Sequence, residues 1–102
     1  MSLLFQTPTK EVDVGFLVFV QRYATDLLKW DILTFFAHNP HFRGSLPQLA
    51  HQLRRNSPAL QPEIGDLVLA GILTQAPTAD NKTIYHLTDD PYLRQMTLKF
   101  AD

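Results

Sequence analysis

The side chains best suited to chemistry are basic, and they are concentrated in one stretch of the chain. No acidic residue lies between Asp31 and Glu63, a gap of 31 residues. The arginines and histidines of this stretch are Arg43, Arg54, Arg55, His38, His41 and His51. With neutral histidines the stretch carries a formal charge of +3 and the rest of the chain −4, which together give the net charge of −1. Because guanidinium groups bind phosphate oxygens, this asymmetry predicts a phosphate-binding face on an otherwise acidic molecule.

Other kinds of site have little support in the sequence. His38 and His41 are three residues apart, but Pro40 lies between them and no carboxylate or thiol accompanies them, so we expect no metal ion there. The chain contains no cysteine, which excludes disulfides, thiolate metal sites and cysteine nucleophiles. We interpret Asp89 and Asp90 as negative charge at a helix N-terminus rather than as a catalytic pair. No nucleophile elbow or phosphate-binding glycine loop is present. We therefore expect no catalytic residue, no cofactor and no enzyme.

Length and composition favour one folded domain. The chain has 102 residues, of which 45% are apolar and 11% aromatic, enough for a packed core. Met1 to Lys10 do not resemble a signal peptide. The longest apolar run, Phe16 to Val20, has five residues, far fewer than the ~20 needed to span a membrane. We expect a cytoplasmic protein with no membrane association.

The N-terminal segment is predicted to form a helix from Thr7 to Tyr23. Thr7 and Pro8 are typical of a helix start, and large side chains follow at helical spacing. The residues of this stripe are Val12, Phe16, Phe19 and Tyr23. Gly15 and the β-branched residues lower helical propensity, so a buried strand over Phe16 to Val20 is the alternative.

A second helix is expected from Thr25 or Asp26, either of which could cap it, to Asn39. It ends there because the residue before Pro40 is restricted to extended conformations. Phe42 and Arg43 could form a very short strand, followed by a turn at Gly44.

The next segment contains the clearest local signal. Ser45 to Gln48 has the S-x-x-Q pattern of a capping box, with proline in the first turn. The short helix that it begins is expected to end at Arg54–Asn56. Ser57 and Pro58 begin another helix, which Gly71 is expected to end in a left-handed conformation.

A hairpin and a last helix complete the predicted order of elements. A strand begins at Ile72, a polar turn covers Ala76 to Lys82, and the returning strand is Thr83 to Leu87. Thr88 is expected to cap the last helix, whose apolar stripe is Leu93, Met96 and Phe100.

Three motifs within this order are similar to those of a known family. Leu49–Leu53 has the pattern L-A-x-x-L, and Tyr85–Thr88 has the pattern Y-x-L-T. Between them, Leu60–Leu73 has apolar residues at i, i+4 and i+7 followed by Gly-Ile-Leu. Over Thr25 to Leu93 the chain resembles the winged helix-turn-helix family of bacterial transcription regulators, broadly its MarR and PadR groups. The resemblance implies a mainly α fold with a small β-hairpin.

The resemblance also implies binding of double-stranded DNA. A helix fits the major groove, a short preceding helix holds it against the phosphates, and the hairpin, or wing, reaches an adjacent groove. The residues expected at the DNA are Arg43, Gln48, Arg54, Arg55, Asn56, Ser57, Gln61, Asn81 and Lys82. The expected recognition helix departs from the family pattern: Pro62 removes a backbone donor and could delay the helix start to Gln61, and the carboxylates of Glu63 and Asp66 would repel phosphates.

The expected organisation is a single domain and a homodimer. Residues 1–24 form a dimerisation helix, residues 25–88 the winged helix-turn-helix core and residues 89–102 the C-terminal helix. The residues expected at the dimer interface are Phe16, Phe19, Tyr23, Met96 and Phe100. A winged helix that binds another protein is the alternative function, favoured by the acidic recognition helix and the net charge of −1. Any small-molecule effector stays unspecified by the sequence.

Overall fold

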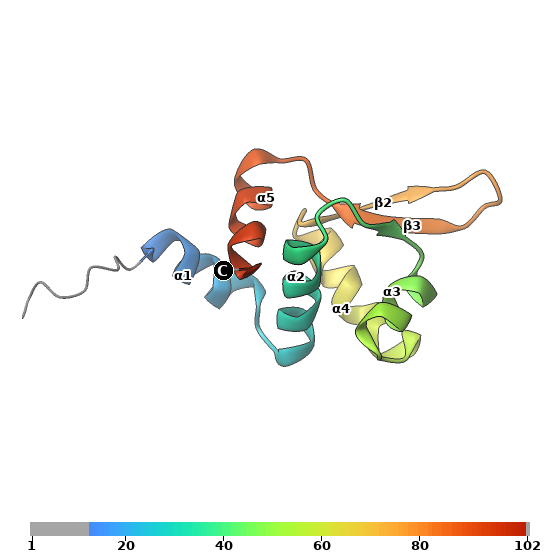
Figure 1. The fold of residues 1–102 in the computed structure, drawn as a ribbon, viewed down its shortest axis with the longest axis horizontal. Coiled ribbons are helices and arrows are strands. Elements are labelled where there is room, and N and C mark those ends of the chain that lie inside the picture. Colours follow the sequence, from blue (N-terminus) through green and yellow to red (C-terminus); the bar gives the residue numbers. More distant parts are fainter. Residues whose placement is uncertain (1–12, 102) are drawn as a thin grey trace, which may run out of the picture.

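Five α-helices surround a core, and a small antiparallel sheet extends from it (Figure 1). The computed structural model describes residues 13–101. The helices are α1 (Val14–Tyr23), α2 (Leu27–His38), α3 (Leu46–Leu53), α4 (Ser57–Leu69) and α5 (Pro91–Leu98), followed by the short 3-10 helix η2 (Lys99–Ala101). The strands are β1 (Arg43–Gly44), β2 (Leu73–Pro77) and β3 (Thr83–Leu87). This is the expected order and the expected mainly α class with a β-hairpin.

Each α-helix begins at a polar side chain that satisfies backbone N–H groups otherwise left without a partner. At Ser45 the predicted capping box is complete: Ser45 Oγ accepts from Gln48 N at 3.3 Å, and Gln48 Oε1 accepts from Ser45 N at 2.8 Å. The other caps are Asp13, Asp26, Asn56 and Asp90, each accepting from the N–H three residues later.

One helix start differs from the prediction, and another lies outside the described residues. The last helix is capped by Asp90, not by Thr88, because Thr88 Oγ1 accepts instead from Asp90 N at 3.0 Å and so forms the turn before the helix. Helix α1 begins at Val14 after its cap Asp13, whose backbone is extended, so the predicted helix is not continuous through Asp13; the expected start at Thr7 lies outside the described residues. The segment 16–20 is helical, so the alternative of a buried strand is wrong.

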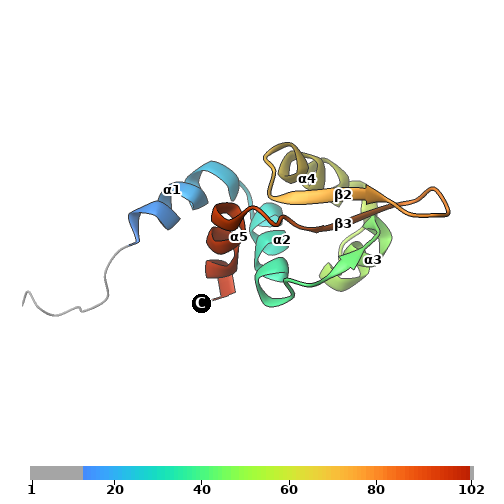
Figure 2. The same ribbon diagram turned by 90° about the horizontal axis from the view of Figure 1, so that it is seen from above.

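The sheet has the strand order β1-β3-β2, with both pairs antiparallel. Strand β1 lies one residue later than the expected Phe42–Arg43, because Gly44 pairs with Tyr85 instead of forming a turn and Phe42 precedes the strand. A side chain at this position would collide with its surroundings: a Cβ atom on Gly44 would lie 2.7 Å from Phe42 Cζ and 2.9 Å from Gln48 Oε1. In the views of Figures 1 and 2 the β2–β3 hairpin extends from the helical body, with α5 and α1 at the other end.

The core lies where α2 packs against α4, α5 and η2. Its largest fully buried side chains include Ile32, Leu33 and Phe36 of α2 and Leu60 and Ile64 of α4. Gly71 ends α4 with a φ of +85°, the left-handed conformation expected of it, which turns the chain directly into β2. The core therefore fixes α4 and the hairpin in one orientation.

Candidate nucleic-acid interface

The turn between α3 and α4 is short and internally hydrogen-bonded. Arg54 adopts the left-handed conformation, with φ 57° and ψ 45°, which is uncommon for a residue other than glycine. Arg55 N donates to Ala50 O at 3.0 Å, and Asn56 Oδ1 accepts from Ala59 N at 2.9 Å. The two helices are thus joined rigidly through three exposed polar residues, Arg54, Arg55 and Asn56.

The two arginines of this turn have different surroundings. Arg55 forms an ion pair with Asp31 of α2, with 2.6 Å between Nη2 and Oδ2. This pair is exposed, so it contributes little stability, but it occupies part of the Arg55 guanidinium. Arg54 is also exposed and has no ion-pair partner among the described residues. Arg54 is therefore the freer of the two cations.

The outer face of α4 carries mostly small and apolar side chains. Its inner face is formed by Leu60, Ile64 and Leu67, all buried. The exposed residues of α4 are Pro58, Ala59, Gln61, Pro62, Gly65, Asp66 and Leu69. Pro62 does not delay the helix start as the sequence suggested, because α4 runs without a break from Ser57 with the proline inside it.

The two carboxylates of α4 are held by one lysine of α2. Lys29 Nζ lies 2.6 Å from Glu63 Oε1, 3.0 Å from Asp66 Oδ2 and 3.1 Å from Asp26 Oδ2. The Lys29 side chain is only 11% exposed, whereas those of Asp26 and Asp66 are 42% and 59% exposed. A lysine at the centre of three carboxylates ties the recognition-helix candidate to α2 and compensates part of the negative charge of that helix.

The ion-pair cluster shifts the pKa values of Lys29 and Asp26 in the directions that keep both charged. Hydrogen bonds that Lys29 donates, first to Glu63 and then to Asp66 and Asp26, hold its pKa well above the usual range, although desolvation opposes the shift. The pKa of Asp26 is lowered, mainly by the hydrogen bond that this helix cap accepts from the backbone N–H of Lys29. Lys29 and Asp26 therefore both stay charged throughout the neutral pH range.

The tip of the hairpin is a polar turn between β2 and β3. Thr78 N donates to Lys82 O at 2.7 Å and Asn81 N donates to Thr78 O at 3.0 Å, while Asn81 has a φ of 67°. Thr78 Oγ1 also donates to Asp80. The Lys82 side chain is exposed at the end of this turn. A hollow of about 450 Å³ separates the wing from the start of α3. It is lined by Ser45, Leu46, Pro47, Lys82, Thr83 and Tyr85.

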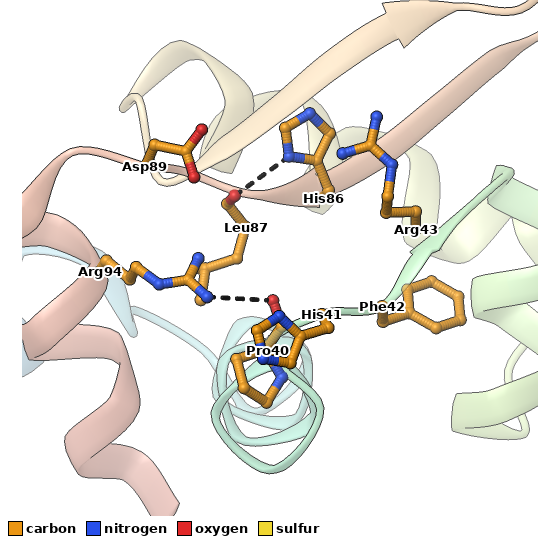
Figure 3. Close-up of a pocket in the computed structure, with 8 residues that line it drawn as sticks. All are labelled: Pro40, His41, Phe42, Arg43, His86, Leu87, Asp89 and Arg94. Carbon is orange, nitrogen blue, oxygen red and sulfur yellow. Dashed lines mark hydrogen bonds between the residues drawn. The ribbon is translucent and has the colours of Figure 1, made fainter.

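The residues that the sequence assigned to DNA fall into separate groups in the structure. Arg54, Arg55, Asn56, Ser57 and Gln61 lie together at the turn and the first half of α4, and Asn81 and Lys82 lie at the wing tip. Gln48 is exposed, but its side-chain oxygen completes the cap of α3. Arg43 pairs with His86 across β1 and β3 and borders two pockets, one with His86 and Arg94 (Figure 3) and the other along α3 with Gln48 and His51.

The residues assigned to a dimer interface belong to the core of the single chain or pack against it. Phe100 packs edge-to-face against Phe16, with 5.1 Å between ring centroids, and against Phe19 at 6.2 Å. Phe19, Met96 and Phe100 are buried in the monomer, and Tyr23 packs on Phe19. The apolar residues that α1 exposes are its outer ones, Val14, Leu17 and Val18.

Lys29 was not predicted from the sequence. It falls on the apolar stripe of α2, three residues before Ile32 and seven before Phe36, and a lysine at such a position is the signal that could have revealed it. Among residues 13–101 no three His, Cys, Asp or Glu side chains are grouped so that they could hold a metal ion. Within the same residues no helix has the length and apolarity to cross a membrane.

Several solved structures with a similar arrangement of elements are winged-helix transcription regulators. HlyU from Vibrio cholerae is 17% identical with a TM-score of 0.63, over 86% of this chain and 90% of that one. The adhesin competence repressor of Streptococcus pyogenes is 17% identical with a TM-score of 0.59, over 85% of this chain and 63% of that one. NadR in complex with 4-hydroxyphenylacetate is 17% identical with a TM-score of 0.60, over 94% of this chain and 78% of that one.

The chain has a winged-helix fold. This confirms the fold expected from the sequence motifs, with α3 and α4 as the helix-turn-helix and β2–β3 as the wing. No protein-family model matches the sequence of this winged helix, and no curated protein matches it. At 17% identity the likeness to these structures shows the winged-helix fold alone, because one fold can carry many functions.

Proposed function

We propose that the protein is a transcription regulator that binds duplex DNA through the α3–α4 turn, the first half of α4 and the wing. One observation carries this proposal. The 31-residue stretch without an acidic residue contains α3 and the turn, and Lys29 neutralises part of the charge of Glu63 and Asp66, the next two carboxylates along α4. The surface around the turn is therefore free of the uncompensated acidic side chains that would repel a phosphate backbone.

The exposed polar residues would have two roles, contact with phosphates and contact with bases. Arg54 at the turn and Lys82 at the wing tip are long, flexible cations that can contact phosphates, which position the protein without reading sequence. Gln61 is the exposed amide on the first half of α4, and glutamine can pair with both N6 and N7 of adenine. Asn56 and Ser57 follow the turn arginines at the start of α4 and could also contact the DNA. Arg55 would contact a phosphate in competition with Asp31.

The proposal includes a homodimer. Val14, Leu17 and Val18 of α1 are 65%, 49% and 51% exposed, and a second copy of α1 would cover them. Phe16 and Phe19 would support that interface from beneath by fixing α1 on Phe100. A two-fold dimer would present two α4 helices to successive half-sites of DNA. In this proposal the protein acts in the cytoplasm, as a single domain and without catalysis.

Binding of variants to a selected duplex and a scrambled duplex, at several salt concentrations, tests these roles. Arg54→Ala or Lys82→Ala should weaken binding to both duplexes alike and flatten the plot of log K against log salt by about one unit per lost contact and subunit. Gln61→Ala should leave the slope unchanged and cost ~1–3 kcal/mol on the selected duplex only. Arg22→Ala is the matched control, because Arg22 is an exposed arginine of α1 beside Leu69, at the end of α4 farther from the turn. Equal effects of Arg54→Ala and Arg22→Ala would show that the DNA face is assigned wrongly.

A second function has one specific observation in its favour. The outer face of α4 combines Pro58, Pro62 and Gly65 with Leu69, which is 88% exposed, and it carries no basic side chain. Small and apolar residues of this kind suit contact with a protein better than base reading. In that case Leu69→Glu should abolish partner binding, and the wild-type protein should bind no duplex even at low salt.

A further inference from the structure

One exposed ion pair lies at the α3–α4 turn of the proposed DNA interface. Arg55 of the turn reaches back to Asp31 of α2, 24 positions away, with 2.6 Å between Nη2 and Oδ2. The two side chains are 46% and 43% exposed. Of the arginines among residues 13–101, Arg55 is the one that has an ion-pair partner. The two arginines of this turn, Arg54 and Arg55, therefore differ in how freely they can contact DNA.

The pair adds little to the stability of the fold. An ion pair between exposed side chains is weak, because water and salt screen it. The backbone of the turn is already fixed by other contacts: Arg55 N donates to Ala50 O at 3.0 Å, and Asn56 Oδ1 accepts from Ala59 N at 2.9 Å. The pair therefore matters more for what the Arg55 guanidinium can contact than for the shape of the turn.

Asp31 differs from the acidic residues of α4 in its counter-ion. Glu63 and Asp66 both contact Lys29 Nζ, at 2.6 and 3.0 Å, and keep that partner whatever Arg55 does. Among the ion pairs of residues 13–101, Asp31 has Arg55 as its one partner. When Arg55 turns to a DNA phosphate, the Asp31 carboxylate is left uncompensated within the reach of one arginine side chain from that phosphate, and the two negative charges repel each other.

We propose that Asp31 sets the affinity of the protein for DNA by occupying Arg55 in the free protein. This inference rests on the proposed DNA binding and identifies a residue that opposes it. The carboxylate takes the place of a phosphate oxygen at the guanidinium, so DNA binding exchanges one anionic partner for another instead of adding a contact. Because phosphate contacts carry no sequence information, Asp31 weakens binding to every duplex by the same factor. Asp31 is thus a positioning residue that acts through Arg55.

The exchange of partners also affects the salt dependence of binding. A cation that neutralises a phosphate releases counterions and contributes about −0.9 to the slope of log K against log salt. In the wild type the uncovered Asp31 carboxylate restores a negative charge near the phosphates, which cancels much of that release. Asp31→Asn removes this charge, so the slope should become steeper by up to about one unit per subunit. A merely structural role of Asp31 would leave the slope unchanged.

A double-mutant cycle on a selected and a scrambled duplex, at several salt concentrations, tests the inference. Asparagine keeps the size of the aspartate side chain, so the variant should fold as the wild type does. Asp31→Asn should tighten binding to both duplexes by about two- to fivefold per subunit, the range expected from an exposed ion pair. In the Arg55→Ala background the same substitution should give less than half of that gain in log K, because the pair is already absent.

Asp89→Asn is the matched control for the change in net charge. Asp89 is an exposed residue on the connection between β3 and α5, outside the α3–α4 turn (Figure 3). Its substitution should change the affinity much less than Asp31→Asn, and equally with and without Arg55. Equal gains from Asp31→Asn and Asp89→Asn, or equal gains from Asp31→Asn in the two backgrounds, would overturn the inference.

The Nε–Hε signal of Arg55 in NMR spectra reports on the pair without DNA. Asp31→Asn should shift this signal in the free protein, and addition of duplex to the wild type should move it away from its free position. A signal that does not respond to Asp31→Asn would also overturn the inference. If the wild type binds DNA and only the gain in Asp31→Asn is missing, the inference alone fails. If neither protein binds any duplex at low salt, the proposed function fails with it.

Discussion

Replacing Lys29 by methionine should reveal how much the fold depends on one buried cation. The methylene stem of lysine and the methionine side chain have similar size, so Lys29→Met keeps most of the packing of α2 and removes the charge. It leaves Asp26, Glu63 and Asp66 facing one another without a counter-ion, where the wild-type contacts to Lys29 are 2.6 to 3.1 Å. The substitution therefore converts a compensated cluster into three mutually repelling carboxylates.

The expected loss follows from the exposure of the partners. Removing one member of a fully buried ion pair costs about 3–5 kcal/mol, because the remaining charge stays buried and unpaired. Here only Glu63, at 22% exposure, is well shielded, while Asp26 and Asp66 can recover water. We therefore expect a loss of about 2–3 kcal/mol at pH 7, which for a domain of this size lowers Tm by roughly 10–20 °C.

The pH dependence provides a second, independent signature. The pKa of Asp26 is lowered in the folded state, so its stabilisation is complete above the unfolded pKa of about 4 and is lost as pH falls through the folded pKa. The pKa of Lys29 is raised, so its stabilisation is complete below the unfolded pKa of about 10.4 and is lost as pH rises through the folded pKa. Between pH about 6 and 10 the difference in unfolding free energy between wild type and Lys29→Met should be constant.

Urea denaturation of both proteins at pH 7 and pH 3 measures these quantities. Because carboxyl groups ordinarily titrate near pH 4, repulsion between carboxylates that lack a counter-ion is weak at pH 3. The difference in unfolding free energy should therefore shrink to less than about half of its value at pH 7. Lys99→Met is the matched control, because it removes a single, more exposed ion pair with Asp13 and should cost much less than Lys29→Met. A loss below about 1 kcal/mol at pH 7, or one that does not change at pH 3, would refute the reasoning.

Two further substitution pairs test the fold and the dimer. Gly65→Ala should raise the free energy of unfolding by about 0.5–1 kcal/mol, because Gly65 lies within a helix and an added Cβ would meet no atom within 4 Å. Gly71→Ala should lower the free energy of unfolding by about 1–2 kcal/mol, because φ is +85° at that position. Urea denaturation measures both changes, and the same sign for both would contradict the assigned backbone. Leu17→Glu should convert the proposed dimer to a monomer at micromolar concentration in sedimentation experiments, while Leu69→Glu on α4 should not, and a wild-type monomer would contradict the dimer itself.

The elements of this fold could be predicted from the sequence because their signals are local. The capping box at Ser45 and the glycine at Gly71 involve contacts within a few residues, and each formed as expected. The error at Thr88 also has a local cause, since threonine, Asp89 and Asp90 are competing caps within three positions and the sequence does not rank them. Asp90 accepts from Leu93 N and so determines where α5 begins.

Which charged side chains of the candidate site are paired could not be predicted, because the pairs join residues far apart in the sequence. Lys29 and Glu63 are 34 positions apart, so the compensation of the α4 carboxylates could not be read from α4 alone. Arg55 is similarly occupied by Asp31, 24 positions away. Arg43 belongs to the basic stretch by sequence position, and its pairing with His86 places it on β1 beside α3 rather than in the turn itself. The charge of a segment therefore predicted a basic face, and the tertiary structure decided which side chains remain available to it.

The central claim, binding of duplex DNA, is tested most directly by the affinity of the wild-type protein for a selected duplex as a function of salt. Each neutralised phosphate contributes about −0.9 to the slope of log K against log salt. With Arg54, Lys82 and a few neighbouring donors in each of two subunits, we predict measurable binding at low salt and a shallow slope of roughly −4 to −7. No binding to any duplex at low salt would contradict the claim and leave the outer face of α4 as a surface for protein contact.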